Sequence, residues 1–362
     1  MTLVVCPNLA IDRVLAATAV RPGATMRCRA LFQQAGGKGA NVARALGLLG
    51  GGALLTGFAA GHAGRLFADL AAGEGLEVDL VAGVGEVRVS TVVLADDGRV
   101  TRLYEYGPRI GPAEERALTH AVAAHHAAAG EWALVTGAAA PGAAAGLYAG
   151  LVGTLHAGGY HVMVDATEAQ LAGTLAAGPD FVKVNLDEAC TAVGGPNADC
   201  MDASRAPGGE RRAEALELSR RLVAAGAASA LVTAGAAGAA GLAGAESLAG
   251  GDARRVAGST AVAGAGGAYG TWTGAGATAR SAGNVEWWVH AAPVTVVNPV
   301  GSGDCFAAAL LLGAERGLPT AAALALAAGA AAANAGTART GHFDAAVARE
   351  LASRASVGPP GS

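Results

Sequence analysis

Aromatic side chains are scarce in this sequence, and it has no concentration of basic residues. Phe, Trp and Tyr make up 4% of the 362 residues, whereas 52% are hydrophobic and 56 are glycine. That composition is typical of an Ala/Gly-rich soluble α/β enzyme and excludes a disordered or fibrous chain. The formal net charge of −4 comes without a Lys/Arg-rich arm, so we expect no nucleic-acid partner.

Cysteine pairs and long apolar runs are also missing. The five cysteines include no CxxC pair and leave one over, which argues against a zinc knuckle or a disulfide framework and favours a reducing cytoplasm. The apolar run at residues 3–6 is too short for a signal peptide and has no basic flank before it. Residues 321–333 are nearly all alanine, which favours a packed helix over a membrane span. We therefore expect a cytoplasmic protein without a membrane partner.

Short β-branched runs alternate with Ala/Leu-rich segments of helical length. The candidate strands are TLVVC, STVVLA, ALVTG, HVMVDA, DFVKVN, ALVTAG and VTVVN. The alternation predicts parallel βαβ units, with helices on both faces of one sheet. The length suits one large α/β domain or two modest ones.

Two segments that depart from this strand–helix alternation predict a small β lid. Residues 13–30 and 85–106 resemble exposed strands, the second with a hairpin turn at Asp96-Asp97-Gly98. Exposed edge strands often pair between subunits, so we expect a homodimer through the lid. The remaining predicted parts are a core at 1–12, 31–84 and 107–344, loop insertions at 195–212 and 244–284, and a C-terminal helix end and tail at 345–362.

A first glycine-rich turn, Gly36-Gly37-Lys38-Gly39, comes directly before a helix-forming stretch. Glycines let the backbone approach a ligand closely, and a helix start offers free N–H groups to an anion or a hydroxyl-rich ligand. The turn is not a Walker A loop, and no stretch matches GxGxxG, which disfavours an NAD-dependent oxidoreductase. By itself, such a turn is more often purely structural.

A second glycine-rich loop, NPVGSGDC, spans residues 298–305. Successive amides of Gly301, Ser302 and Gly303 can form an anion-binding nest at the start of a helix. Asp304 at that start is either an N-cap or a general base that accepts a proton from an attacking hydroxyl. The loop alone does not decide between these two interpretations.

Together, the two loops make the chain resemble the ribokinase/PfkB family of carbohydrate kinases. GGKGANVAR at 36–44 is similar to the first family signature, and NPVGSGDCFAAALLLG at 298–313 is similar to the second. The resemblance implies a ribokinase-like three-layer αβα sandwich with a mainly parallel central sheet and a small β lid. It also implies ATP as phosphoryl donor, with Asp304 as base and Gly301, Ser302 and Gly303 as an anion hole.

The implied acceptor is a sugar phosphate. CPNLAIDRV resembles the family's NPALD stretch, which implies that Asp12 binds sugar hydroxyls, and the first signature adds Gly37, Lys38 and Asn41. The pattern is most similar to the 1-phosphofructokinase and tagatose-6-phosphate kinase branch. Such a substrate needs cations, for which the candidates are Lys38, Arg88 and Arg102, although lid arginines are also ordinary solvated charges.

The implied nucleotide site uses later segments. DFVKVNLDEA resembles KPNxxE, which implies Lys183 and Asn185 near the phosphates and Asn185 with Glu188 organising Mg²⁺ through water. An Asn and a Glu three residues apart also suit a helix-capping pair. The other implied nucleotide contacts are Thr233, Gly235, Gly238 and, in the adenine pocket, Asn334.

Several positions depart from the family pattern, mostly at the substrate end: Leu9, Ala138, Val184, Tyr104 and Tyr106. Two alternatives therefore stay open. The chain is either a kinase of a different polyol, such as a cyclitol or an unusual sugar, or a kinase-fold sensor that binds a sugar phosphate without turnover. Asp304, Asn185 and Glu188 argue against the sensor, which needs neither a base nor a metal organiser.

Overall fold

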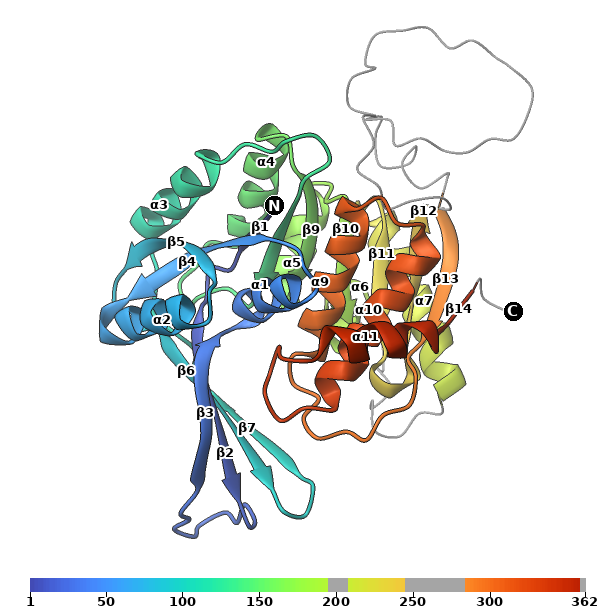
Figure 1. The fold of residues 1–362 in the computed structure, drawn as a ribbon. Helices are drawn as coiled ribbons and strands as arrows, with labels where there is room; N and C mark the ends of the chain where they lie inside the picture. Colours follow the sequence, from blue (N-terminus) through green and yellow to red (C-terminus); the bar gives the residue numbers. More distant parts are fainter. Residues whose placement is uncertain (195–207, 245–283, 359–362) are drawn as a thin grey trace, which may run out of the picture.

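The computed structural model describes residues 1–194, 208–244 and 284–358, which form a ten-stranded sheet and a separate four-stranded sheet (Figure 1). The order of the large sheet is β14-β13-β12-β11-β10-β9-β8-β1-β4-β5. Its strands from β11 to β5 are parallel, and β12, β13 and β14 are antiparallel. Its bounds are β1 (Thr2–Val5), β4 (Ala53–Ala60), β5 (Glu77–Gly83), β8 (Trp132–Gly137), β9 (His161–Ala166), β10 (Phe181–Asn185), β11 (Ala230–Thr233), β12 (Ala239–Gly244), β13 (Asn284–His290) and β14 (Ser356–Gly358).

Helices cover both faces of this sheet, because successive strand residues point to opposite sides. Val4 and Leu134 belong to one apolar cluster, and their neighbours Val5 and Val135 belong to the other. The first cluster is closed by α1 (Lys38–Leu48), α2 (Gly61–Gly73), α9 (Ser302–Glu315), α10 (Thr320–Ala335) and α11 (Ala345–Ser353). The second is closed by α3 (Pro112–Ala123), α4 (Leu147–Ala157), α5 (Glu168–Leu175), α6 (Leu186–Val193) and α7 (Gly208–Ala224). The predicted three-layer αβα sandwich is thus confirmed.

The lid sheet consists of β2 (Ala10–Ala17), β3 (Arg29–Gly36), β6 (Arg88–Ala95) and β7 (Val100–Tyr104), in the order β3-β2-β6-β7. It projects from the layered body in Figure 1. Its first two strands reach beyond the expected segment 13–30 at both ends. The reason is that β3 leads directly through the turn at Gly37 into α1, so the strand continues up to the glycine loop.

The apolar run VTVVN at 294–298, predicted as a strand, is not one. The backbone amides of Val297 and Asn298 both donate to the carbonyl of Ala335, at the C-terminal end of α10. Val296 is 60% exposed, because this segment lines a cavity instead of joining a sheet. A short β-branched run does not reveal whether a neighbouring strand is there to pair with it.

Two other predicted boundaries also change. Residues 208–212, expected in a loop insertion, belong to α7, while 195–207 and 245–283 lie outside the described residues. The expected C-terminal helix end and tail instead contain the whole of α11 and the strand β14, which pairs with β13.

The cysteine prediction is only partly met. Cys6, Cys28 and Cys305 are free thiols, but Cys190 is disulfide-bonded, which corrects the expectation drawn from the cysteine pattern. None of the helices in the described part of the chain combines the length and the hydrophobicity that a membrane span requires.

Leu134→Ala is expected to lower the free energy of unfolding by about 2–5 kcal/mol, since Leu134 is fully buried in the central strand β8 and its removal leaves a cavity. Leu66→Ala on α2 is the matched control, because Leu66 is 38% exposed; its cost should be about 1 kcal/mol or less. Urea denaturation of both variants measures the difference. Equal losses would contradict the assigned core.

Candidate active site

A cavity of about 960 Å³ lies at the carboxyl ends of the parallel strands, beside the lid sheet. Ligands of open α/β sheets bind at this edge. The cavity gathers nearly all the site residues expected from the sequence: Asp12, Gly37, Lys38, Asn41, Arg88, Arg102, Lys183, Asn185, Glu188, Thr233, Gly235, Gly238, Gly301, Ser302, Gly303 and Asp304. These residues come from both sheets and from the starts of α1, α6 and α9.

Asp304 stands in the first turn of α9, with its side chain 7% exposed. Its Oδ2 accepts a hydrogen bond of 2.8 Å from Asn41 Nδ2. Burial raises the pKa of Asp304 to about 7, although the nearby Lys38 ammonium opposes the shift. A carboxylate that gains and loses its proton near neutrality is suited to act as a general base.

Backbone amides surround this carboxylate. In the described part of the chain, the amides of Gly301, Gly303 and Asp304 have no hydrogen-bond partner, as is usual for the first turn of a helix. Ser302 differs from the expected nest, since its amide donates to the carbonyl of Pro299 at 3.3 Å. Gly301 has φ 83°, and a Cβ there would lie 2.6 Å from Thr340 Cγ2, so this position requires glycine. The loop can therefore present amides to an anion.

Asn334, which the resemblance placed in an adenine pocket, lies behind the glycine loop. It does not line the cavity and is fully buried. Its Nδ2 donates to Val300 O at 2.9 Å and to Ser302 Oγ at 3.0 Å, and its Oδ1 accepts from the amide of Gly341. Asn334 therefore supports the glycine loop from behind, and its expected contact with a nucleotide stays a prediction.

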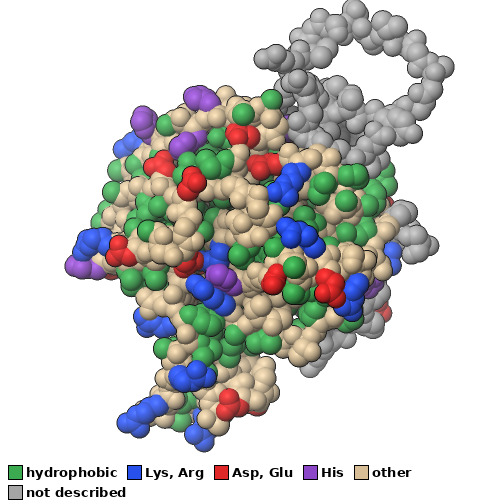
Figure 2. Space-filling model, in the orientation of Figure 1, with side chains coloured by type: hydrophobic (Ala, Val, Ile, Leu, Met, Phe, Trp, Pro, Cys, Tyr) green, Lys and Arg blue, Asp and Glu red, His purple; other side chains and the backbone are tan. Residues whose placement is uncertain are grey.

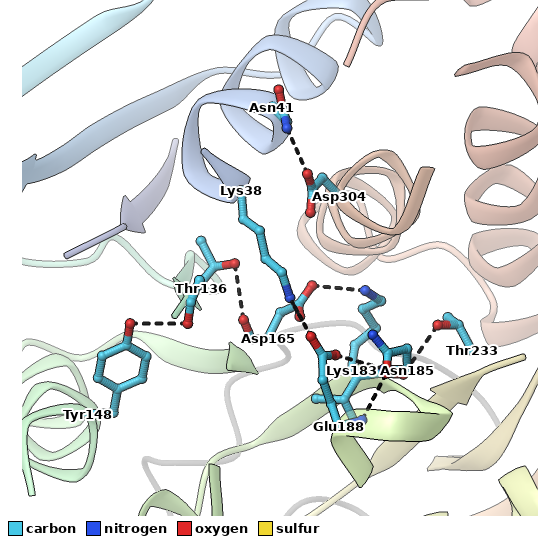
Figure 3. Close-up of polar contacts among 12 residues, drawn as sticks. Lys38, Asn41, Thr136, Tyr148, Asp165, Lys183, Asn185, Glu188, Thr233 and Asp304 are labelled. Atoms are coloured by element: carbon cyan, nitrogen blue, oxygen red, sulfur yellow. Dashed lines mark hydrogen bonds and ion pairs between the residues drawn. The ribbon is translucent and has the colours of Figure 1, made fainter. Parts of the chain in front are cut away.

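Two lysines converge on one carboxylate that the sequence analysis missed (Figure 3). Asp165, at the end of β9, is fully buried and lies 2.8 Å from both Lys38 Nζ and Lys183 Nζ. Burial alone would raise the pKa of Asp165, but the two ammonium groups hold it below its usual value. The signal available in the sequence was an Asp at the carboxyl end of a predicted strand.

Lys38 is correspondingly not a free cation for a substrate phosphate. Besides Asp165, its Nζ contacts Glu188 Oε1 at 2.9 Å. Burial would lower the pKa of Lys38, but the charges of Asp165, Glu188 and Asp304 outweigh it and raise that pKa. Lys38 therefore links the start of α1 to Asp165 and Glu188, and its expected contact with a substrate phosphate stays a prediction.

Asn185 and Glu188 form a reciprocal cap at the start of α6. Asn185 Oδ1 accepts from the Glu188 amide, and Glu188 Oε2 accepts from the Asn185 amide, both at 2.9 Å. Both residues also line the cavity, so the capping interpretation does not exclude a role toward a ligand.

The side chains around Asp165 and Glu188 have the chemistry of a magnesium site. The Asp165 and Glu188 carboxylates supply the oxygen donors that Mg²⁺ prefers, and they already hold a cation, the Lys38 ammonium, between them. Within the described residues, no group of three or more His, Cys, Asp or Glu side chains is arranged to hold a metal. Mg²⁺ would therefore be held partly by phosphate oxygens and water.

The lid end of the cavity carries Asp12, Arg88 and Arg102. Burial raises the pKa of Asp12 to about 6, with the guanidinium groups of Arg44 and Arg88 opposing the shift. A Cβ at Gly36 would lie 2.3 Å from Asp12 Cγ, so the glycine loop is what lets this carboxylate approach. The arrangement offers one acceptor for hydroxyls and two cations for an anion.

The opposite end is largely apolar. Thr233, Gly235 and Gly238 line it at the turn between β11 and β12, where Gly238 has φ 99° and a Cβ would lie 2.0 Å from Val289 O. Its other walls are aliphatic: Val289, Ala291, Ala292, Pro293, Val294, Val296, Ala328, Ala331, Ala332 and Ala335. Such a surface suits a flat apolar ring system, and it explains the exposed valines of the misassigned strand.

Comparison with known proteins agrees with this geometry. The chain matches the description "pfkB family carbohydrate kinase" over residues 1–264 and 270–345, and it belongs to that family. It is 31% identical to a 1-phosphofructokinase of Rhodobacter capsulatus over 183 residues, and 34% identical to one of Haloferax volcanii over 115 residues. The first match covers 50% of this chain and 58% of the relative, and the second 32% and 37%.

Solved structures share the fold over nearly the whole chain. The tetrameric inhibited form of phosphofructokinase-2 from Escherichia coli has a TM-score of 0.75 at 20% identity, covering 98% of both chains. The same enzyme in complex with fructose-6-phosphate has a TM-score of 0.74 at 21% identity, covering 97% of this chain and 98% of that one. At these identities the likeness is one of fold.

Asp165→Asn is expected to destabilise the protein by about 3–5 kcal/mol, because it leaves the buried Lys183 ammonium without its charge partner. Asp79→Asn is the matched control, since Asp79 is 47% exposed and pairs with His125 on the surface; its cost should be about 1 kcal/mol or less. Urea denaturation midpoints compare the two variants. A loss for Asp165→Asn as small as that of the control would contradict a structural role for the pair of lysine contacts.

Proposed function

We propose that this protein is an ATP-dependent kinase that transfers the γ-phosphoryl group to a hydroxyl of a sugar phosphate of the fructose-1-phosphate or tagatose-6-phosphate type. The observation that carries the proposal is Asp304. A buried carboxylate with a pKa near 7 lies beside unpartnered helix amides, in a cavity with cations at one end and aliphatic walls at the other.

In the proposed reaction, the acceptor hydroxyl lies beside Asp304 and attacks the γ-phosphorus as the carboxylate takes its proton. The O–P bond to the acceptor forms while the bond to the leaving ADP oxygen breaks. The amides of Gly301, Gly303 and Asp304 stabilise the negative charge on the transferring group. A Cβ at Gly303 would lie 3.1 Å from Lys183 Nζ, so the Lys183 ammonium lies next to this anion hole.

Mg²⁺ would be held near Asp165, Asn185 and Glu188, directly or through water, and its charge would neutralise the nucleotide phosphates. Lys38 contributes to the geometry of the same region. Lys38 joins Asp165 and Glu188 to the start of α1, so these two carboxylates and the first glycine loop keep a fixed separation.

A sugar phosphate as acceptor is supported by the charges at the lid. Asp12 can accept two hydroxyl hydrogen bonds, and Arg88 and Arg102 suit a phosphate dianion. The relatives named 1-phosphofructokinase agree with an acceptor of this class.

One observation keeps a different polyol in consideration. Tyr104 lines the cavity and is 53% exposed, at a position where the chain departs from the family pattern. An aromatic ring there favours an acceptor with an apolar face or a different size. The sensor alternative is less well supported, because a site that only binds has no need of a buried base between two cations.

A homodimer through the lid also belongs to this proposal. Leu103, Tyr104 and Tyr106 are 59%, 53% and 88% exposed on and after β7. Figure 2 shows hydrophobic and basic side chains together on the projecting lid. A second copy that covers this apolar surface would remove it from water.

Asp304→Asn is expected to abolish ATP-dependent ADP release, by about 10³-fold or more, since asparagine cannot accept the proton. For the parent protein, kcat/KM should fall as pH drops below about 7, because the base must be ionised. Asp69→Asn on the exposed surface of α2 is the control and should retain activity. Near-normal turnover by Asp304→Asn would rule out this base.

Arg102→Met is expected to raise KM for a phosphorylated sugar by about 10-fold or more, because a charge-assisted contact to the phosphate is lost. Arg99→Met is the control on the same lid, since Arg99 is 71% exposed and pairs with Asp97. A panel of sugar phosphates, free sugars and cyclitols, followed by ADP release, identifies the acceptor. Tight binding without turnover across that panel would favour the sensor, and an unchanged KM for Arg102→Met would exclude its phosphate contact.

A further inference from the structure

A buried chain of hydrogen bonds continues from Asp304 away from the cavity. Asp304 Oδ2 accepts from Asn41 Nδ2 at 2.8 Å, and Asn41 Oδ1 accepts from Arg44 Nη1 at 3.0 Å. Arg44 Nε then donates to Glu74 Oε2 at 2.7 Å. The side chains of Asn41 and Arg44 are each 4% exposed, so water does not compete for these bonds. Figure 3 shows the Asn41 amide directed at Asp304.

The chemistry of the two neighbours fixes the orientation of the Asn41 amide. A guanidinium group carries only donors, so the atom that faces Arg44 must be the amide oxygen. The NH₂ group is then left to face Asp304. In the reversed orientation, donors would face the guanidinium and the oxygen would face the carboxylate, and both contacts would be repulsive. Arg44, three residues along α1, thereby decides that Asp304 receives a donor.

Arg44 is itself held rigidly. Its Nη2 donates to the carbonyl of Ala35 in β3 and contacts Glu74 Oε2 at 2.6 Å, while Glu74 Oε1 accepts from the Ala35 amide. The backbone at Gly341 covers the pair, since a Cβ there would lie 2.9 Å from Arg44 Nη1 and 3.1 Å from Asn41 Oδ1. Arg44 thus makes contacts with Asn41, Ala35 and Glu74 at the same time.

We propose that Arg44 is a positioning residue, which holds the Asn41 side-chain amide so that its NH₂ group donates to the catalytic carboxylate of Asp304. The inference rests on the proposed function, in which Asp304 is the base. It goes beyond that function because Arg44 does not line the cavity.

Other charges also act on Asp304 and are unchanged by a substitution at Arg44. Lys38 of α1 and Lys183 of β10 favour the ionised carboxylate, and Asp165 of β9 opposes it. Three further titratable groups, Cys6, Tyr104 and Cys305, feel the charge of Asp304, and the pKa of each is raised. Asp12, whose pKa burial raises to about 6, lines the same cavity.

Arg44→Lys keeps the charge but lacks the planar fork, so it cannot bond Asn41, Ala35 and Glu74 together. The Asn41 donor stabilises the ionised form of Asp304, and its loss raises the pKa of the base. Since the base must be ionised, the acid limb of the pH profile should move up by about 0.5 to 1 pH unit, which corresponds to one net hydrogen bond. At pH 6 kcat/KM should fall about 3- to 10-fold, with a smaller change at pH 8.5.

A double-mutant cycle separates positioning from a general structural effect. Asn41→Leu should shift the acid limb by itself, and Arg44→Lys added to it should cause no further shift. Arg316→Lys is the control, since Arg316, just past the far end of α9 from Asp304, donates to the carbonyl of Gly50; the limb should stay in place. Additive shifts in the cycle, or an unmoved limb in Arg44→Lys, would overturn the proposal.

A measurement without substrate keeps this test separate from the proposed function. In protein labelled with ¹³C at the aspartate carboxyls, the Asp304 signal is assigned by its loss in Asp304→Asn, and its titration gives the pKa directly. Arg44→Lys should raise that pKa, and so should Gly341→Ala, which presses on the Asn41–Arg44 pair without removing it. If the parent protein turns over no acceptor, the proposed function fails while this titration still decides the role of Arg44. An unchanged Asp304 titration in both variants overturns the inference.

Discussion

The buried contacts of Asp165 with Lys38 and Lys183 are the constraint on which the rest of the site depends. A fully buried carboxylate is costly unless cations of good geometry surround it, and two ammonium groups at 2.8 Å meet that condition. These contacts join the start of α1 to the end of β9 and to β10, and Lys38 adds the start of α6 through Glu188. Segments distant in the chain are thereby held at fixed separations around one cavity.

Small residues make this convergence sterically feasible. A Cβ at Gly313 in α9 would lie 2.7 Å from the Cβ of Ala323 in α10, and one at Gly329 would lie 2.2 Å from Ala348 O in α11. Helices built from alanine and glycine therefore pack backbone against backbone, which agrees with the scarcity of aromatic residues. Close packing of α9 fixes the helix start that carries Asp304, and other alanines of α10 form part of the aliphatic wall of the cavity.

The two ends of the site differ in the burial and the hydrogen-bond support of their side chains. At the phosphoryl end, Asp304 is supported by the chain through Asn41 to Arg44, and the glycine loop is supported from behind by Asn334. At the lid end, Arg102 and Tyr104 are exposed side chains of an edge strand. Under the proposed function, the chemistry that needs exact placement would lie on buried elements, and recognition of the acceptor would lie on a surface that can change with little cost to stability.

The sequence by itself determined the αβα class, the two glycine loops and the candidate base, because hydrophobic alternation and glycine spacing are local properties. It did not determine what each polar side chain contacts. Lys38 meets partners 127 and 150 positions away, Asn334 supports the glycine loop from behind, and the run at 294–298 lines a cavity and pairs with no strand among the described residues. Only the tertiary structure decided these outcomes, since the energy of a buried charge or an unpaired strand depends on neighbours that are remote in the chain.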